Sequence, residues 1–178
     1  MPEPTLVVFS GLPGAGKTTL AAATAAALDC THLSVDTAEA AMWRCGVGRD
    51  AGAGVAAYEV AAAVAEVQLK AGRDAVVDAV NAVAEARATW DRVGSAAGVP
   101  VVWFECVLDD LALHRARLEA RPPVPDFADP TWADVCRRRE EYAPWPDSVV
   151  RVETSGPVEE LLTQVLERLG RLPSQRRR

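Results

Sequence analysis

The sequence predicts an α/β fold in which helices cover both faces of a parallel sheet. Short apolar segments rich in β-branched residues alternate with helix-forming segments along almost the whole chain, and no repeat or long linker interrupts them. This alternation is typical of parallel strands joined by crossover helices. The chain has 178 residues, of which 49% are hydrophobic, so it is long enough for one domain with a substantial core. We expect that domain to span residues 1–170.

The individual elements follow from local composition. The strands expected from short apolar runs are residues 5–10, 32–35, 74–80, 99–108 and 148–154. The helices expected from helix propensity are residues 17–28, 36–43, 55–72, 84–98, 109–121, 131–142 and 157–170. Gly72 and Gly98 stand where glycine commonly closes a helix. Glycines in residues 46–54 and prolines in residues 122–130 predict two loops.

Charge and cysteine content exclude several classes of protein. The net charge is −6 although residues 171–178 carry four arginines, so the rest of the chain is more acidic still and would repel a phosphate backbone. We therefore expect no nucleic-acid partner and a frayed, solvated tail. The cysteines form no CxxC pair, which argues against a zinc site or disulfide framework. No run reaches membrane-spanning length and no secretory signal is recognised, so we expect a cytoplasmic protein without a membrane partner.

The stretch FSGLPGAGKTTLAAA, residues 9–23, has the form GxxxxGK(S/T) between a predicted strand and a predicted helix, which is the context that a phosphate-binding loop (P-loop) requires. Its glycines allow successive N–H groups to converge on one anion, and the following helix adds its positive dipole end. Lys17, one of only two lysines, can reach the β- and γ-phosphates, and the Thr18 hydroxyl can bind Mg²⁺. The nucleotide-binding residues expected here are Gly11, Pro13, Gly14, Ala15, Gly16, Lys17, Thr18 and Thr19.

The rest of the chain separates the classes of enzyme that use a nucleoside triphosphate. GTPases read the base with an Asn-Lys-x-Asp element, but the only asparagine is Asn81 and no lysine follows it. Motor and AAA-type ATPases normally place a water-activating glutamate after the aspartate on the Mg²⁺ side, whereas Asp78 is followed by Ala79. Without a resident water activator, transfer to a bound hydroxyl is favoured over hydrolysis. The sequence therefore predicts a kinase that uses ATP or GTP with Mg²⁺.

Two carboxylates are expected at the carboxyl edge of the sheet, where open α/β sheets bind ligands. Asp36 follows the strand at 32–35 and is the candidate base for the acceptor hydroxyl, although Asp36 and Glu39 also have the spacing of a capping box. Asp78 ends the strand at 74–80. We expect Asp78 in the Mg²⁺ shell or in substrate binding, with a helix cap as the alternative.

Arginines in the segment HRARLEAR can supply the positive charge that phosphoryl transfer needs. At about 100° per residue, His114, Arg117 and Arg121 share one helix face. A second helix, with arginines at 137–139, follows the proline-rich segment. Two such helices predict a lid over about residues 115–140 that closes on phosphates and excludes water. The alternative is a solvated helix surface with ion pairs to nearby glutamates.

Candidates for the substrate pocket lie on the helices after the second and third strands. The two aromatic residues among them could stack on a substrate or belong to the core, and the two arginines could hold an acidic substrate or face water. The asparagine could bond a sugar hydroxyl or serve a local turn. These candidates are Met42, Trp43, Arg44, Tyr58, Asn81 and Arg87.

Taken together, GLPGAGKTT, the VD after the second strand, VVDAVN, and HRARLEAR before a proline-rich segment resemble the small P-loop kinases. That group includes chloramphenicol phosphotransferase, the kinase domain of polynucleotide kinase, zeta toxins and gluconate kinase. The resemblance implies a three-layer P-loop NTPase fold, with a five-stranded parallel sheet in the order 2-3-1-4-5, helices on both faces and a helical lid.

The resemblance also implies roles for particular residues. Asp36 would be the acceptor-side base and Lys17 the phosphate clamp. Arg117 and Arg121 would be lid arginines that act on the transferred phosphate, and Arg117 would also contact the nucleotide. The loop at 154–157, with Gly156 and Pro157, would lie against the nucleobase.

The acidity of the chain and the lack of an appended domain favour a small, soluble, hydroxylated acceptor. Small kinases of this kind often inactivate antibiotics, and the preference for arginine over lysine suits a GC-rich genome, so the leading specific prediction is an antibiotic O-phosphotransferase. Nucleosides and sugars are the other expected acceptors. The alternatives are a regulatory P-loop NTPase switch and a toxin-like kinase that acts on a sugar nucleotide. We expect a monomer or a homodimer.

Overall fold

The structure is a computed structural model, and it describes residues 3–48, 51–121 and 129–171. Its strands form one parallel sheet in the order β2-β3-β1-β4-β5. The strands are β1 (Leu6–Ser10), β2 (Thr31–Ser34), β3 (Ala75–Ala79), β4 (Val101–Val107) and β5 (Val150–Glu153). Both the predicted α/β class and the predicted strand order are confirmed. Most of the basic tail and most of the proline-rich segment lie outside the described residues.

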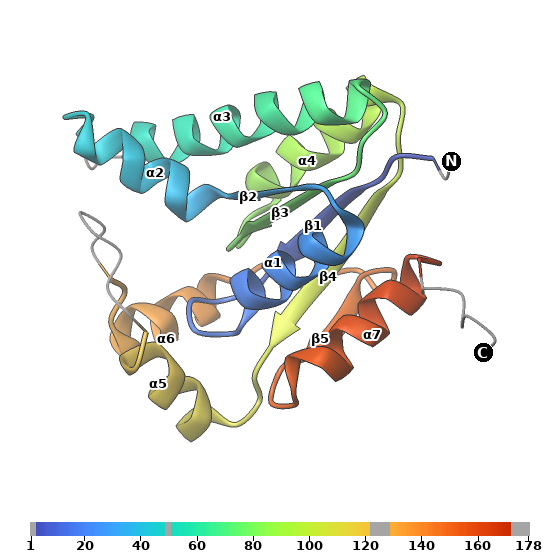
Figure 1. Cartoon of the computed structure of the whole chain (residues 1–178). Coiled ribbons are helices and arrows are strands. Elements are labelled where there is room, and N and C mark those ends of the chain that lie inside the picture. The colour runs from blue at the N-terminus through green and yellow to red at the C-terminus, as the bar shows by residue number, and fades with distance from the viewer. Residues whose placement is uncertain (1–2, 49–50, 122–128, 172–178) are drawn as a thin grey trace.

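Helices cover the two faces of this sheet (Figure 1). One face carries α1 and α7, the other carries α3 and α4, and α5 and α6 lie beyond the carboxyl ends of β1 and β4. The helices are α1 (Lys17–Leu28), α2 (Val35–Arg44), α3 (Ala51–Lys70), α4 (Ala84–Ala97), α5 (Leu111–Glu119), α6 (Trp132–Glu141) and α7 (Val158–Arg168). Within the described ranges, no helix combines the length and apolarity that crossing a membrane requires.

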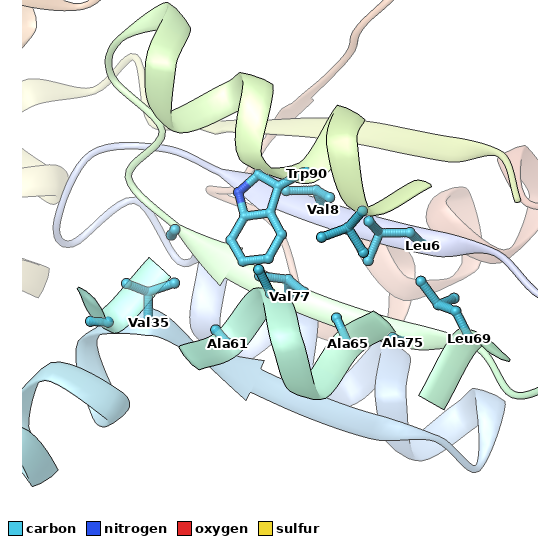
Figure 2. Packing of buried hydrophobic residues seen from close by; sticks show 13 residues of the cluster. Leu6, Val8, Val35, Ala61, Ala65, Leu69, Ala75, Val77 and Trp90 are labelled. Carbon is cyan, nitrogen blue, oxygen red and sulfur yellow. The ribbon is translucent and has the colours of Figure 1, made fainter. Parts of the chain in front are cut away.

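The core consists of two apolar clusters, one on each side of the sheet. On the side of α3 and α4, the fully buried Trp90 packs with Leu6, Val8 and Val77 of the strands (Figure 2). Alanines along the inner face of α3 complete this cluster, and their small size lets the helix lie close to the sheet. The opposite cluster includes Phe9, whose ring stacks on another phenylalanine at a centroid distance of 5.1 Å. The sheet is therefore a buried, fixed platform for the loops at its carboxyl edge.

The predicted starts of two helices differ from the structure, that of α3 by four residues and that of α2 by one. Helix α3 begins at Ala51, although residues 46–54 were expected to form a loop because of their glycines. Burial of Ala53, which is 2% exposed, offsets the helix-propensity cost of the glycines beside it. Helix α2 begins at Val35, one residue before the predicted start, and its N-cap is Ser34 with no side-chain cap bond. Asp36 therefore lies inside the first turn, and the capping box expected for it is absent.

The glycine closures are confirmed, since Gly72 follows α3 and Gly98 follows α4 with φ values of 76° and 70°. The strand register determines which residues lie side by side at the carboxyl edge of the sheet. Asp78 of β3 lies opposite both Phe9 of β1 and Ser34 of β2. The ends of these three strands therefore meet at one place. The P-loop, Asp36 and Asp78 converge there.

Candidate active site

The P-loop adopts a conformation that only glycine accommodates at two of its positions. At Gly11, with a φ of 151°, an added Cβ would lie 2.5 Å from the Cys106 carbonyl oxygen. At Gly14, with a φ of 82°, it would lie 3.2 Å from atoms of His114 and Leu118 on α5. Helix α1 begins directly after the loop, so its unpaired N–H groups face the same space. The loop is shaped to hold an anion.

A cavity of about 550 Å³ opens above this loop and reaches the start of α7. Most of the predicted nucleotide-binding residues line it, together with both predicted lid arginines: Gly14, Gly16, Lys17, Thr18, Thr19, Arg117, Arg121 and Gly156. Gly11 and Ala15 line a different cavity behind the loop, and the Pro13 carbonyl faces α5. Pro157 is the N-cap residue of α7 and stands between two residues of the cavity wall. We call this space the nucleotide cavity.

Lys17 and Arg121 meet at the carboxylate of Asp36. The Asp36 Oδ2 atom lies 4.0 Å from the Lys17 Nζ atom and 3.9 Å from an Arg121 guanidinium nitrogen. Lys17 is only 3% exposed, and the side chain of Asp36 is 20% exposed. The first turn of α2 thus brings one accessible carboxylate between a cation of the P-loop and a cation of the segment that follows α5. A carboxylate in this position can accept a proton beside a transferring phosphoryl group.

Asp78 is fully buried and accepts two hydrogen bonds. Thr18 Oγ1 donates to its Oδ2 atom at 2.8 Å, and His32 Nε2 donates to its Oδ1 atom at 2.7 Å. Burial raises the pKa of Asp78, but the His32 hydrogen bond and the Lys17 charge outweigh it and hold the pKa below its usual value. Asp78 therefore carries a negative charge inside the protein.

A hydroxyl and a charged carboxylate within hydrogen-bond distance are oxygen ligands of the kind that Mg²⁺ prefers. Within the described ranges no group of three or more His, Cys, Asp or Glu side chains is arranged to hold a metal. Mg²⁺ commonly uses one or two protein oxygens and completes its shell with water and phosphate oxygens, so Thr18 and Asp78 fit this ion.

Helix α5, the first helix of the predicted lid, is joined to the P-loop through His114. The His114 Nε2 atom donates to the Pro13 carbonyl at 2.8 Å, and Arg139 of α6 lies 3.3 Å from its Nδ1 atom. Burial lowers the pKa of His114, and the charges of Arg139 and Arg117 lower it further. The neutral ring therefore links both lid helices to the phosphate-binding loop.

Arg117 is anchored at the opposite end of the nucleotide cavity. Its guanidinium donates to the Thr154 carbonyl at 2.8 Å, and the Thr154 hydroxyl donates to the Ala15 carbonyl at 2.9 Å. Arg117, the P-loop and the loop before α7 are therefore held together. The alternative expected for these arginines, ion pairs on a solvated helix surface, applies instead to Arg115 and Arg137. Each of them forms an exposed ion pair with a residue of its own helix.

A second cavity, of about 530 Å³, lies among α3, α6 and the segment that follows β3. Tyr58 and Arg138 line it, and the Tyr58 hydroxyl accepts a hydrogen bond from the Asn81 backbone N–H at 3.2 Å. Burial raises the pKa of Tyr58 to about 12, and the charges of Asp36 and Glu39 raise it as well. We call this second space the acceptor cavity, a name that anticipates the role proposed for it below.

The structure does not bring the other predicted substrate residues into the acceptor cavity. Trp43 is half-buried and Arg44 is exposed at the end of α2. Asn81 is fully buried, with its amide donating to Ser10 Oγ and its Oδ1 accepting from Trp90 Nε1 at 2.9 Å. Its φ of 51° fits the turn role that was the alternative.

Arg87 is also occupied inside the protein. It donates to the carbonyls of Asn81, Ala143 and Pro144, and its guanidinium lies 3.5 Å from the centroid of the Trp145 ring. Its side chain clamps the segment after α6 against the segment after β3.

Sequence reasoning gave no role in the site to two of its residues, His32 and Glu39. His32 had a usable signal, because the chain contains only two histidines. Both of them contact the phosphate-binding machinery, one through Asp78 and one through the P-loop. Thr154 belongs to the loop that the family resemblance placed against the nucleobase, and it lines the nucleotide cavity. Arg138 belongs to the arginine run of the second predicted lid helix, but its place in the wall of the acceptor cavity was not predicted.

Comparison with known proteins gives the family. The sequence profile of a family described as an AAA domain matches residues 6–142, which is more than half of the chain. No curated protein shows a significant match.

Solved structures share the fold. The APS kinase of Mycobacterium tuberculosis, solved with AMPPNP and APS, is 20% identical with a TM-score of 0.73, and the match covers 96% of this chain and 99% of that one. A sugar kinase from a Janibacter species is 17% identical with a TM-score of 0.69, covering 97% of both chains. A gluconokinase from Sinorhizobium meliloti is 17% identical with a TM-score of 0.64, covering 97% of this chain and 95% of that one. At these identities the likeness establishes a P-loop kinase fold.

Proposed function

The chain belongs to the AAA-domain family, and from that premise we propose that it is a kinase that transfers the γ-phosphoryl group of a nucleoside triphosphate to a hydroxyl group of a small molecule. The single observation that carries the proposal is the position of Asp36. Its carboxylate lies between Lys17 and Arg121, which line the nucleotide cavity.

In the proposed reaction, Lys17 and the P-loop amides hold the β- and γ-phosphates. The Asp36 carboxylate orients the acceptor hydroxyl and accepts its proton as the new O–P bond forms and the bond to the β-phosphate oxygen breaks. Arg121 lies on the other side of Asp36 and balances the charge that spreads over the transferring group. Mg²⁺, held through Thr18 and Asp78, would neutralise phosphate charge.

Hydrolysis as the principal activity has less support. Asp78 is followed by Ala79, so the position at which motor ATPases carry a water-activating glutamate has no proton acceptor. A regulatory switch that signals through slow hydrolysis remains the second candidate function. Its basal turnover would not depend on Asp36.

The structural likeness to an APS kinase bound to AMPPNP, an ATP analogue, supports ATP as the nucleotide. Among acceptors, we propose hydroxylated antibiotics first, then nucleosides and sugars. The four cysteines are unpaired in the structure, which supports a reaction in the reducing cytoplasm.

The direct test is mass spectrometry of reaction mixtures. Purified protein with Mg²⁺ and either ATP or GTP is incubated with a panel of hydroxylated antibiotics, nucleosides and sugars. We expect at least one acceptor to gain a single phosphoryl group, with equimolar loss of triphosphate. Steady triphosphate hydrolysis without any modified acceptor would contradict the kinase and favour the switch.

A further inference from the structure

We infer that the acceptor of this kinase is a hydroxyl compound that carries a positively charged amine and binds in the acceptor cavity. This inference rests on the proposed function and specifies the chemical class of its substrate. It follows from the charges around the cavity and from its apolar walls.

The described side chains around the acceptor cavity carry more negative than positive charge. Glu85 and Glu141 line it, and each is exposed to solvent. Glu59 also lines it but is bonded to Arg92 at 2.6 Å, so its charge is compensated. Arg138 is the one cation among the lining residues.

Glu39 adds a further carboxylate on the side that faces Asp36. A Cβ added to Gly54, which belongs to the cavity wall, would lie 3.7 Å from the Glu39 Oε1 atom. The wall glycine therefore leaves the Glu39 carboxylate next to the space. A positively charged ligand would be attracted by Glu39, Glu85 and Glu141, and only Arg138 would repel it.

The rest of the wall suits a carbon skeleton. Val55 and Val83 are 65% and 46% exposed at the cavity, and smaller apolar residues lie beside them. A bound ligand would cover these side chains, which are otherwise costly to leave in water. A volume of about 530 Å³ is within the usual range for small-molecule sites.

This charge pattern contrasts with what anionic acceptors require. The similar structures named for APS and for gluconate concern acceptors that carry sulfate, phosphate or carboxylate groups. In the acceptor cavity of this chain, such an anion would find one arginine and several carboxylates. Repulsion at the rim would slow its entry as well as weaken its binding.

The test compares acceptors of similar size and shape that differ in charge. The acceptor with the fastest transfer in the screen is measured beside its amine-bearing, neutral and carboxylate-bearing analogues, and the pyranoses glucosamine, glucose and glucuronate form the first such set. We expect kcat/KM to be highest for the amine and at least about tenfold lower for the carboxylate, with the difference shrinking at high salt. Equal values, or a preference for the carboxylate, would overturn the inference and leave the kinase intact. Triphosphate hydrolysis without transfer to any acceptor would overturn both.

Charge variants separate recognition from catalysis. Replacing Glu85 and Glu141 together by glutamine should raise the KM for the amine about fivefold, and should raise the KM for the neutral analogue by less. Arg138→Gln should lower the KM for the amine. Glu167→Gln, an exposed carboxylate on α7 outside both cavities, is the matched control and should change nothing. An unchanged KM in the double variant would contradict the inference even if transfer itself proceeds.

Discussion

The nucleotide cavity and the acceptor cavity have nearly the same volume, about 550 and 530 Å³, but different kinds of group line them. The first is a backbone site, with glycines, a helix N-terminus and cations arranged around a space that suits an anion. The second is a side-chain site, with valines, glutamates and a tyrosine drawn from three separate segments. A backbone site tolerates few changes and recognises a common group, whereas a side-chain site can change its ligand through single substitutions.

The largest effect that this difference predicts is at Lys17. Lys17→Ala removes the buried cation that faces the phosphates and Asp36, so kcat should fall by about a thousandfold or more and nucleotide affinity should fall with it. Isothermal titration calorimetry and transfer assays measure the two quantities. The chain's only other lysine, Lys70, pairs with Glu66 on the surface of α3, and Lys70→Ala is the control that should leave both unchanged.

Replacing Asn81 tests whether the acceptor cavity is held in shape by buried residues that do not themselves bind the substrate. Asn81→Ala would leave the buried Ser10 hydroxyl and Trp90 N–H without partners, so the free energy of unfolding should fall by about 2–4 kcal/mol in urea titrations. Thr163→Ala, which removes one exposed hydrogen bond on α7, should cost less than about 0.5 kcal/mol. Normal stability with a raised acceptor KM would instead assign Asn81 to the substrate.

The two predicted lid arginines both line the nucleotide cavity, but we expect their replacement to affect different kinetic constants. Arg121→Ala should lower kcat by about ten- to a hundredfold, since Arg121 reaches Asp36. Arg117→Ala should mainly raise the KM for the nucleotide, because Arg117 fixes the loop at Thr154. Arg115→Ala, which breaks an exposed ion pair on the same helix, serves as the control. Identical kinetic profiles for the Arg117 and Arg121 variants would break the proposed division.

The smallest predicted effect is a pH dependence of stability from His114. Its folded-state pKa lies below the usual 6.5, so as pH falls through 6.5 the unfolded chain binds a proton that the folded protein does not. The free energy of unfolding should therefore decrease toward acid, by at most about 1.4 kcal/mol per pH unit from this group. Urea titrations at pH 7.5 and 5.5 should show a smaller difference in His114→Gln than in the parent. An unchanged difference would exclude this contribution.

The difference between a contiguous backbone site and a site assembled from distant side chains also explains which parts of the protein could be predicted from its sequence. The P-loop is a contiguous motif, and the strand order and most element boundaries follow from alternating patterns and from the family resemblance. Asp36 and Asp78 could be anticipated because each follows or ends a strand at the carboxyl edge. The supports of the site could not, because His32 and Asp78 are 46 residues apart and Thr154 and Ala15 are 139 residues apart.

The acceptor side was the least predictable. Asn81 and Arg87 have the residue types of a binding site, but both are used to hold the segments around the cavity together. Whether a polar side chain faces a ligand or another part of the protein depends on packing between distant segments. For this reason the local sequence does not indicate that Glu85, Arg138 and Glu141 line the acceptor cavity.

The most direct test of the kinase is the replacement Asp36→Asn, measured for both transfer and nucleotide binding. We predict that phosphoryl transfer falls by at least about a hundredfold while the nucleotide Kd stays within about threefold of the parent. Asp147→Asn, an exposed aspartate in the loop before β5, is the control and should retain both properties. Transfer that survives in Asp36→Asn, or nucleotide affinity that is lost in step with transfer, would contradict the role of Asp36 as the acceptor-side base.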